Sequence, residues 1–135
     1  HQAAGSKHVM ELHGSVHRNY CMKCHRFFDA SYMLHSAGVP KCECGGVIKP
    51  DVVLYEEGLD ESVISGAVSA ISAADTLIIG GTSLVAYPAA GLIRYFRGNN
   101  LILINKSHTS ADSNADMVIH DSIEKVLYEA VIAIR

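Results

Sequence analysis

Hydrophobic and polar positions follow a repeating order in the second half of the chain. Short apolar runs alternate with longer segments of mixed residues from about position 50 onward. The pattern predicts strands at 52–55, 76–79 and 101–104, and helices at 61–73, 88–96 and 122–134. Strands that alternate with helices indicate crossover connections, so the fold class is α/β, with a parallel sheet flanked by helices.

Two of these strands, 76–79 and 101–104, are continuous apolar runs instead of alternating ones. Helices on both faces of a sheet require this pattern, so we expect both strands to be central. Helix signals agree with these boundaries: Asp60 stands at a cap position, Pro88 in a first turn and Gly98 just after a helix end. Open parallel sheets bind ligands at the carboxyl ends of their strands, which makes 80–87 and 105–112 the candidate ligand-binding loops.

The first 50 residues follow a different pattern. Residues 9–16 are short and β-like, whereas cysteines, glycines and mixed polar residues fill 21–46. Within that stretch, 29–36 predicts one short helix with Asp29 as its cap. We therefore divide the chain into a core segment at 1–20, an inserted module at 21–46 and an α/β region at 47–135.

Composition and charge narrow the class of protein. The 135 residues are 49% hydrophobic and 19% charged, which suits one ordinary core. The formal charge of -3 gives no reason to expect direct binding of nucleic acid. No apolar run approaches the roughly 20 residues that span a bilayer, and the first residues lack the order of a signal peptide. We expect a cytoplasmic protein that makes no contact with a membrane.

All four cysteines fall within one window of 24 residues. They form two close pairs, Cys21-x2-Cys24 and Cys42-x-Cys44, separated by 17 residues. This is zinc-ribbon spacing, because each pair turns two sulfurs toward one point and the loop brings the pairs together. Four thiolates leave no open coordination position, so we predict one structural zinc ion per chain.

Other arrangements of the same region stay open. The four cysteines could form two disulfides, although a cytosolic compartment argues against stable ones. His17, His25 or His35 could replace a cysteine as a metal ligand. Where four thiols are already present, such histidines are more often surface residues.

Several motifs together resemble the sirtuin family, in its bacterial form. The resemblance rests on Glu11-Leu12-His13-Gly14-Ser15, the two cysteine pairs, Gly80-Gly81-Thr82-Ser83-Leu84, Pro88 and Leu103-Ile104-Asn105. These motifs follow the family order and spacing over essentially the whole chain. The resemblance implies an NAD-dependent protein-lysine deacylase (deacetylase), and a fold that is part of a Rossmann-like sheet with a small inserted zinc-ribbon module.

By this resemblance, His13 is the general base. A lone histidine is usually an ordinary polar residue, but an imidazole that titrates near neutral pH can take a proton from a ribose hydroxyl. The implied reaction begins when the acyl oxygen of an acyl-lysine attacks the nicotinamide-bearing ribose carbon of NAD+ and nicotinamide leaves. His13 then activates a ribose hydroxyl to attack the imidate. The products are lysine, nicotinamide and O-acyl-ADP-ribose, so NAD+ is a consumed co-substrate and zinc takes no part.

The resemblance also assigns the contacts with NAD+, which are Gly81, Thr82, Ser83, Leu84, Asn105, Lys106 and Ile123. Small residues after a buried strand allow close backbone approach, and hydroxyls can donate to phosphate or ribose oxygens. From the local sequence alone, a strand-to-helix turn without a ligand fits the first of these loops equally well. Asn105 matches the family asparagine near the adenosine ribose. Ile123 would meet adenine through its backbone, although an apolar residue at a helix start is usually core packing.

The predicted strand at 52–55 corresponds to the family segment that pairs with an extended acyl-lysine peptide or protein. Val52, Leu54 and Tyr55 are the expected substrate contacts. Tyr55-Glu56 stands where the family usually has Phe-Gly. Tyrosine can still pack over the acyl-lysine stem, and the glutamate would narrow the substrate range or favour basic flanking residues. A plain edge strand ended by charges explains the same residues.

Two parts of the family pattern are absent from these 135 residues: a glycine-rich phosphate loop, and an Asn-Ile-Asp motif expected just before His1. We therefore expect the parent protein to be a deacylase, and this piece to bind NAD+ poorly and to be inactive alone. Half of a parallel sheet exposes an apolar edge, which favours association through that edge or with the missing N-terminal half.

Two further functions stay open. One is a protein ADP-ribosyltransferase, as some relatives are. The other is a non-enzymatic zinc-ribbon interaction module in which His13 is incidental. The retained histidine favours deacylation.

Overall fold

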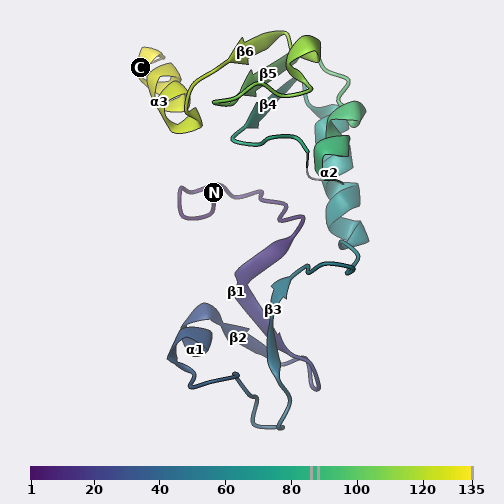
Figure 1. The fold of residues 1–135 in the computed structure, drawn as a ribbon, viewed down its shortest axis with the longest axis vertical. Helices are drawn as coiled ribbons and strands as arrows, with labels where there is room; N and C mark the ends of the chain where they lie inside the picture. Colours follow the sequence, from purple (N-terminus) through teal and green to yellow (C-terminus); the bar gives the residue numbers. More distant parts are fainter. Residues whose placement is uncertain (86, 88, 135) are drawn as a thin grey trace. The chain divides into compact units, whose positions relative to one another are not determined.

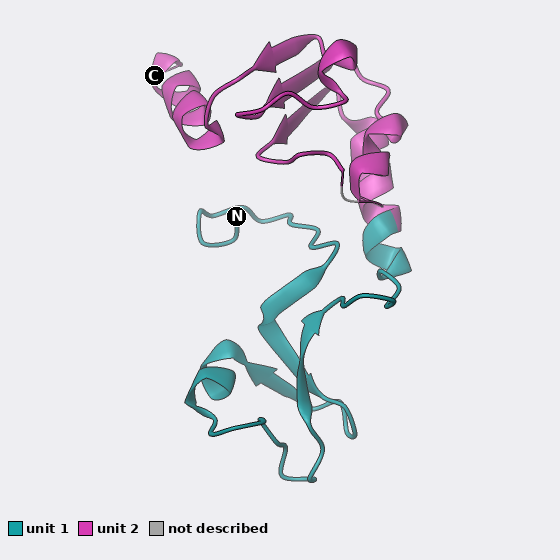
Figure 2. Ribbon diagram, in the orientation of Figure 1, with its two compact units in different colours: residues 1–64 teal, residues 65–135 magenta. Residues whose placement is uncertain are grey.

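The computed structural model of the chain describes residues 1–85, 87 and 89–134, and Figure 1 shows the order of its elements. The chain forms two compact units, His1–Ile64 and Ser65–Arg135 (Figure 2). Antiparallel pairing organises the first unit and parallel pairing the second. The prediction that Pro88 begins a helix falls outside the described residues.

The first unit is built on β1 (Gly14–Cys21), which lies between β2 (Phe27–Asp29) and β3 (Ile48–Val52). The predicted strands at 9–16 and 52–55 were placed wrongly, since β1 begins at Gly14 and β3 ends at Val52. Both predictions were wrong because they followed the apolar residues of the sequence. The strands extend instead over polar residues that pair through their backbones, such as Asp51 opposite Ser15.

An irregularity in the β1–β3 ladder is filled by a side chain. The register shifts between Ser15 and Asn19, and Asn19 is only 1% exposed. Its amide nitrogen donates to the backbone oxygens of Val16 at 3.1 Å and Phe28 at 3.2 Å. The buried amide therefore bonds one carbonyl within the irregular stretch of β1 and one on β2.

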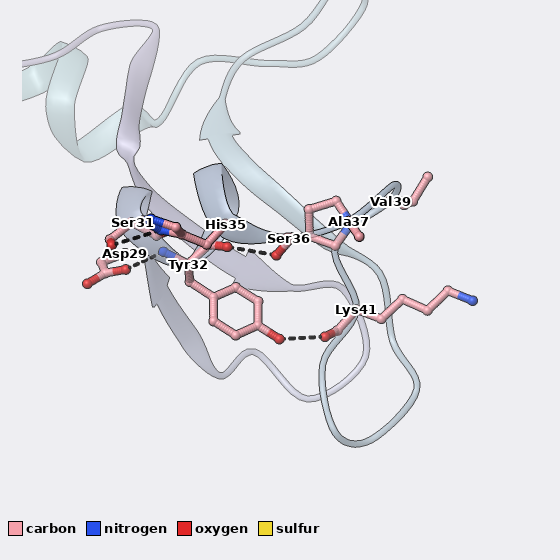
Figure 3. A pocket seen from close by; sticks show the side chains of 9 residues that line it. Asp29, Ser31, Tyr32, His35, Ser36, Ala37, Val39 and Lys41 are labelled. Atoms are coloured by element: carbon pink, nitrogen blue, oxygen red, sulfur yellow. Dashed lines mark hydrogen bonds between the residues drawn. The ribbon is translucent and has the colours of Figure 1, made fainter.

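Helix α1 (Ala30–His35) begins as predicted, with Asp29 as its N-cap accepting from the Tyr32 backbone N–H at 2.8 Å. The Tyr32 hydroxyl donates to the Lys41 backbone oxygen at 2.9 Å, which ties the helix to the loop before Cys42. Figure 3 shows both bonds at the rim of an open hollow along this helix.

The buried core of this module is small. It consists of Cys21, Cys42 and Ile48, with Phe28 and Met33 packed against it. A core of this size contributes little hydrophobic stabilisation, and modules this small usually rely on a metal ion or disulfides as well.

The second unit carries a parallel sheet in the order β4-β5-β6, formed by β4 (Thr76–Gly80), β5 (Asn100–Ile104) and β6 (Met117–Ile119). The prediction of a central strand is confirmed for β5, where Leu101, Leu103 and Ile104 are buried. In the described part of the sheet β4 lies at the edge, and Ile78 is half exposed. Strand β6 was not predicted, because it is short and follows polar residues directly.

The helices that accompany this sheet are α2 (Glu61–Ala73), the 3-10 helix η1 (Ala89–Tyr95) and α3 (Ile123–Ala133), in the expected order, and a short 3-10 helix η2 (Asp112–Asn114) that was not predicted. The cap predicted for α2 is confirmed, since Asp60 accepts from the backbone N–H of Ser62 at 2.8 Å. The predicted helix at 88–96 is a 3-10 helix in its described part. No helix in the described ranges has the length and apolarity needed to cross a membrane.

Helix α3 buries none of its residues and exposes Leu127, Tyr128, Val131 and Ile132. The association expected from the sequence was through the apolar edge of the sheet and not through this helix, and it stays a prediction.

Candidate functional site

His13 lies in a tight turn directly before β1. The Gly14 N–H donates to the Glu11 backbone oxygen at 2.9 Å and closes the turn. The Val53 N–H donates to the His13 backbone oxygen at 3.1 Å and fastens the turn to the residue after β3. The His13 side chain itself is exposed, so its imidazole is accessible to a ligand.

Gly14 is the residue that lets the two strands approach at this turn. Its φ is +76°, in the left-handed region that favours glycine. A Cβ at this position would lie 1.8 Å from the Asp51 backbone oxygen. The His-Gly pair thus has a physical reason: the glycine allows the close pairing that sets His13 beside the end of β3.

Arg18 adds a second tie between the His13 turn and β3. Its guanidinium contacts the Glu11 carboxylate at 2.5 Å and the Asp51 carboxylate at 2.9 Å. The hydrogen bond from Arg18 lowers the pKa of the Glu11 carboxyl, and the bond to Glu11 in turn raises the pKa of Arg18. This network was not predicted, because nothing local in the sequence shows that positions 11, 18 and 51 meet.

The predicted substrate segment forms a turn beyond β3. The Glu57 N–H donates to the Leu54 oxygen at 3.1 Å, and the Leu54 N–H donates to the Glu57 carboxylate at 2.9 Å. The carboxylate also contacts Lys49 at 3.0 Å, and the Leu54 bond is the first cause of the lowered pKa of Glu57. Of the expected substrate contacts, Val52 ends the strand, whereas Leu54 and Tyr55 are exposed on the turn.

Glu56 has a strained backbone in this turn. Its φ is +69°, a conformation that costs a residue with a Cβ about 1–2 kcal/mol. This explains in physical terms why a glycine suits the position better than the glutamate present here.

In the second unit, the carboxyl ends of β4 and β5 lie side by side, with Gly80 opposite Ile104. The loop that follows β4 turns at Gly81, which has a φ of +64° and donates to the Ile104 oxygen at 3.1 Å. Ile123, at the start of α3, fills the space above Gly80, since a Cβ there would lie 1.9 Å from its Cδ1. The structure therefore brings the Gly81 turn and Ile123 to one edge of the sheet.

The rest of that loop borders a hollow of about 350 Å³, lined by Thr82 and Leu84 together with apolar residues of β4 and η1. The Leu84 N–H donates to the Thr82 hydroxyl at 3.2 Å, and Ser83 between them is exposed. Hydroxyls and an exposed backbone at a strand end can donate to ribose or phosphate oxygens.

Asn105 and Lys106 follow β5 at the same edge. The Asn105 backbone N–H donates to the Ile119 oxygen at 3.1 Å, and its side-chain amide donates to the Ser107 oxygen at 2.8 Å. Lys106 is exposed. The residues predicted to bind the nucleotide thus gather within the second unit, while His13 and the substrate segment gather within the first.

The four cysteine sulfurs converge in the first unit, where all lie within 4.8 Å of one another. The Cys21–Cys44 and Cys24–Cys42 sulfur pairs are 3.5 Å and 3.6 Å apart, and all four cysteines are free. A tetrahedral zinc ion with bonds of about 2.3 Å holds its sulfurs about 3.8 Å apart, so the cluster fits the metal and is zinc-ribbon-like.

The pKa values of two of the thiols show how the cluster behaves when no cation is bound. A hydrogen bond from the Cys24 N–H is the first of the effects that lower the pKa of Cys21 to about 6. The Arg26 N–H lowers the pKa of Cys24, but the neighbouring thiols, Cys44 foremost, outweigh it and raise that pKa to about 12. The Cys21 thiolate therefore forms more readily than the Cys24 thiolate. A bound dication would remove this conflict.

A family model described as the Sir2 family matches residues 1–88 of the chain. The chain is 70% identical over 133 residues to an NAD-dependent protein deacetylase of Clostridium perfringens, an alignment that covers 97% of this chain and 54% of that protein.

Solved structures agree with this match. A structure from work on the structural basis of sirtuin substrate affinity is 34% identical with a TM-score of 0.87, over 96% of this chain and 55% of that one. A Sir2 protein with a p53 peptide and NAD+ is also 34% identical, with a TM-score of 0.83 over 98% and 59%. The chain spans about half the length of the curated relatives it matches.

Proposed function

Because the chain belongs to the Sir2 family, we propose that the protein containing it is an NAD-dependent protein-lysine deacylase. The observation that carries the proposal is the position of His13, an exposed imidazole whose backbone is bonded to Val53 at the end of β3. The name of the C. perfringens relative, NAD-dependent protein deacetylase, supports the same activity.

His13 serves as the general base in this proposal. NAD+, when bound, supplies the ribose carbon that the acyl oxygen attacks and the nicotinamide that leaves. The His13 imidazole takes the proton of a ribose hydroxyl, as a histidine placed within reach of such a proton can. Gly14 and the Arg18 network keep the turn in place, so they position the base without touching the substrate. The products are lysine, nicotinamide and O-acyl-ADP-ribose.

The acyl-lysine peptide would bind along the segment that holds Val52, Leu54 and Tyr55. Extended peptides gain affinity by backbone pairing with such a segment, and they place little demand on sequence. Tyr55 is fully exposed, so its ring is available to pack against an acyl-lysine stem. The p53 peptide bound to the similar Sir2 protein supports a peptide or protein substrate.

The nucleotide would bind at the carboxyl edge of the parallel sheet. Gly81, Thr82, Ser83 and Leu84 would meet its phosphate and ribose oxygens, while Asn105, Lys106 and the Ile123 backbone would meet the adenosine. The position of these residues supports the proposed contacts, because each follows a strand end or begins α3 at that edge.

Zinc would be bound by Cys21, Cys24, Cys42 and Cys44. The sulfur separations fit a closed tetrahedral site, and four thiolates leave no position for a reactive water. The ion therefore stabilises the small module and does no chemistry. Chelation should unfold the module, as followed by amide exchange at α1, and added zinc should restore it; a module that stays folded without metal would contradict the role.

Turnover with NAD+ and an acetyl-lysine peptide tests the activity. A protein of the relatives' length that contains this chain should release nicotinamide and deacetylated peptide in equal amounts. His13→Ala should abolish both, whereas His17→Ala, an exposed histidine on the neighbouring strand β1, should leave both unchanged. We expect the 135-residue chain alone to show no turnover, because its sequence has no glycine-rich phosphate loop.

Three other outcomes would overturn the proposal. Deacetylation that persists in His13→Ala would exclude His13 as the general base. Label from NAD+ adenine transferred to protein without deacetylation would favour an ADP-ribosyltransferase. Zinc binding and folding without any response to NAD+ would favour an interaction module.

A further inference from the structure

Two imidazoles and a carboxylate converge in the second unit, away from the cysteines in sequence. The side chains belong to His108 in the loop after β5, Asp112 at the start of η2 and His120 directly after β6. One ligand atom from each lies within 4.8 Å of the other two. Asp112 Oδ2 is 2.9 Å from His108 Nδ1 and 3.3 Å from His120 Nε2.

Parallel pairing of β5 with β6 sets the orientation of His120. Ile104 pairs with Ile119, so the residues that follow, Asn105 and His120, emerge next to each other. His120 Nδ1 lies 3.1 Å from the Asn105 backbone oxygen. A carbonyl oxygen can only accept, so Nδ1 carries the hydrogen and the Nε2 of a neutral ring has a lone pair. A metal-binding histidine is usually held through its other nitrogen in this way.

Thr109 fixes the carboxylate of Asp112. One oxygen, Oδ1, accepts from the Thr109 N–H at 3.0 Å and from its hydroxyl at 2.7 Å. The other oxygen, Oδ2, is left to face both imidazoles. The Nε2 lone pair of His120 and the lone pairs of Oδ2 therefore point at each other, and only a positive charge between them makes that arrangement favourable.

The spacing suits a metal ion as that charge. Zinc held by nitrogen and oxygen ligands at about 2.0–2.1 Å keeps those ligand atoms about 3.4 Å apart in a tetrahedron. The distance from Oδ2 to His120 Nε2, 3.3 Å, is close to this value, and the distance to His108 Nδ1, 2.9 Å, is about 0.5 Å shorter. The two rings are 4.2 Å apart between centroids, so two imidazolium ions would repel each other there. The His108 side chain is 87% exposed, which leaves room for water to complete the coordination.

We propose that His108, Asp112 and His120 form a second metal site, which binds Zn²⁺ or another divalent transition metal with imidazole preference. Two histidines and one carboxylate with an open position are a zinc-binding set. The site has fewer protein ligands than the cysteine cluster and stands open to water, so it fills after that cluster.

Zinc titration into the 135-residue chain, already loaded with one equivalent, tests the proposal. Calorimetry should detect a second equivalent, and His108→Ala should weaken it at least about tenfold, as loss of a direct ligand exceeds the effect of losing a supporting one. His108 is exposed, so this variant should fold normally, and His17→Ala serves as the control. In spectra of the ring nitrogens, zinc should shift His120 Nε2 while His120 Nδ1 keeps its hydrogen.

A stoichiometry that stays at one zinc per chain would overturn the proposal. The positive charge between Asp112 and His120 would then be a proton. A second equivalent that binds His108→Ala as tightly as the unsubstituted chain, or that leaves the His120 ring signals unchanged, would overturn it as well.

Discussion

Replacing Gly14 by alanine tests the close approach that positions His13. Two costs add. A left-handed backbone costs alanine about 1–2 kcal/mol, and the new Cβ would lie 1.8 Å from the Asp51 oxygen, which cannot move without parting β1 from β3. If one or two ladder bonds of about 1 kcal/mol each are lost there, the total is about 3 kcal/mol. That is a large share of the stability of an ordinary domain.

Gly38→Ala is the matched control for this substitution. Gly38 has a φ of +68°, close to that of Gly14, but a Cβ there would meet nothing within 4 Å. It should therefore cost only the backbone term of about 1–2 kcal/mol, less the roughly 0.5 kcal/mol that both alanine variants gain because their unfolded chains are less free. Amide exchange in β1 and β3 of the zinc-loaded chain measures the opening free energy where the strands pair. Equal losses in the two variants would refute the close approach.

Other predictions concern the turn after β3, the start of α1 and the Glu11 network. Glu56→Gly should raise the free energy of unfolding by about 0.5–1 kcal/mol, because glycine relieves the backbone strain but also makes the unfolded chain freer, which offsets part of the gain. Chemical unfolding measures this free energy, and a decrease would contradict the strain. Asp29→Ala should cost about 1 kcal/mol by amide exchange in α1, and Asp29→Asn much less; equal costs would rule out the cap. Arg18 holds the pKa of Glu11 below its ordinary 4.5, so their bond stabilises the fold above that pH and is lost as the pH falls through the lowered value. Unfolding measured from pH 6 to 3 should show this loss, and a slope unchanged in Glu11→Gln would exclude it.

Local signals in the sequence predicted the elements that depend on local chemistry. Asp29 and Asp60 cap helices where expected, β5 is a buried central strand, and the cysteine spacing predicted the sulfur cluster. In each case the deciding residues lie within a few positions of one another, or form a spacing that has few other uses. The helix at α2 has the predicted bounds for the same reason.

Features that depend on pairing between distant segments were missed or misplaced. Tyr55 belongs to a turn instead of a strand, because the Glu57 carboxylate takes the Leu54 N–H. Asn19 is buried because the β1–β3 register shifts beside it, and nothing in its neighbourhood shows that shift. The meeting of His120 with Asp112 was not predicted, since it follows from the register of β5 against β6.

The ladder between β1 and β3 has a consequence for how this protein can change over evolution. Cys21, the last residue of β1, pairs with Ile48, the first residue of β3, so the chain leaves the sheet and returns to it at the same rung. Between them the chain returns once to the sheet, as β2 on the other side of β1, and the length of the loop from α1 to β3 does not alter the position of His13 at the other end of the ladder. Insertions or deletions between α1 and Cys42 should therefore be tolerated by the sheet, as long as β2 keeps its pairing with β1 and the rung itself still closes.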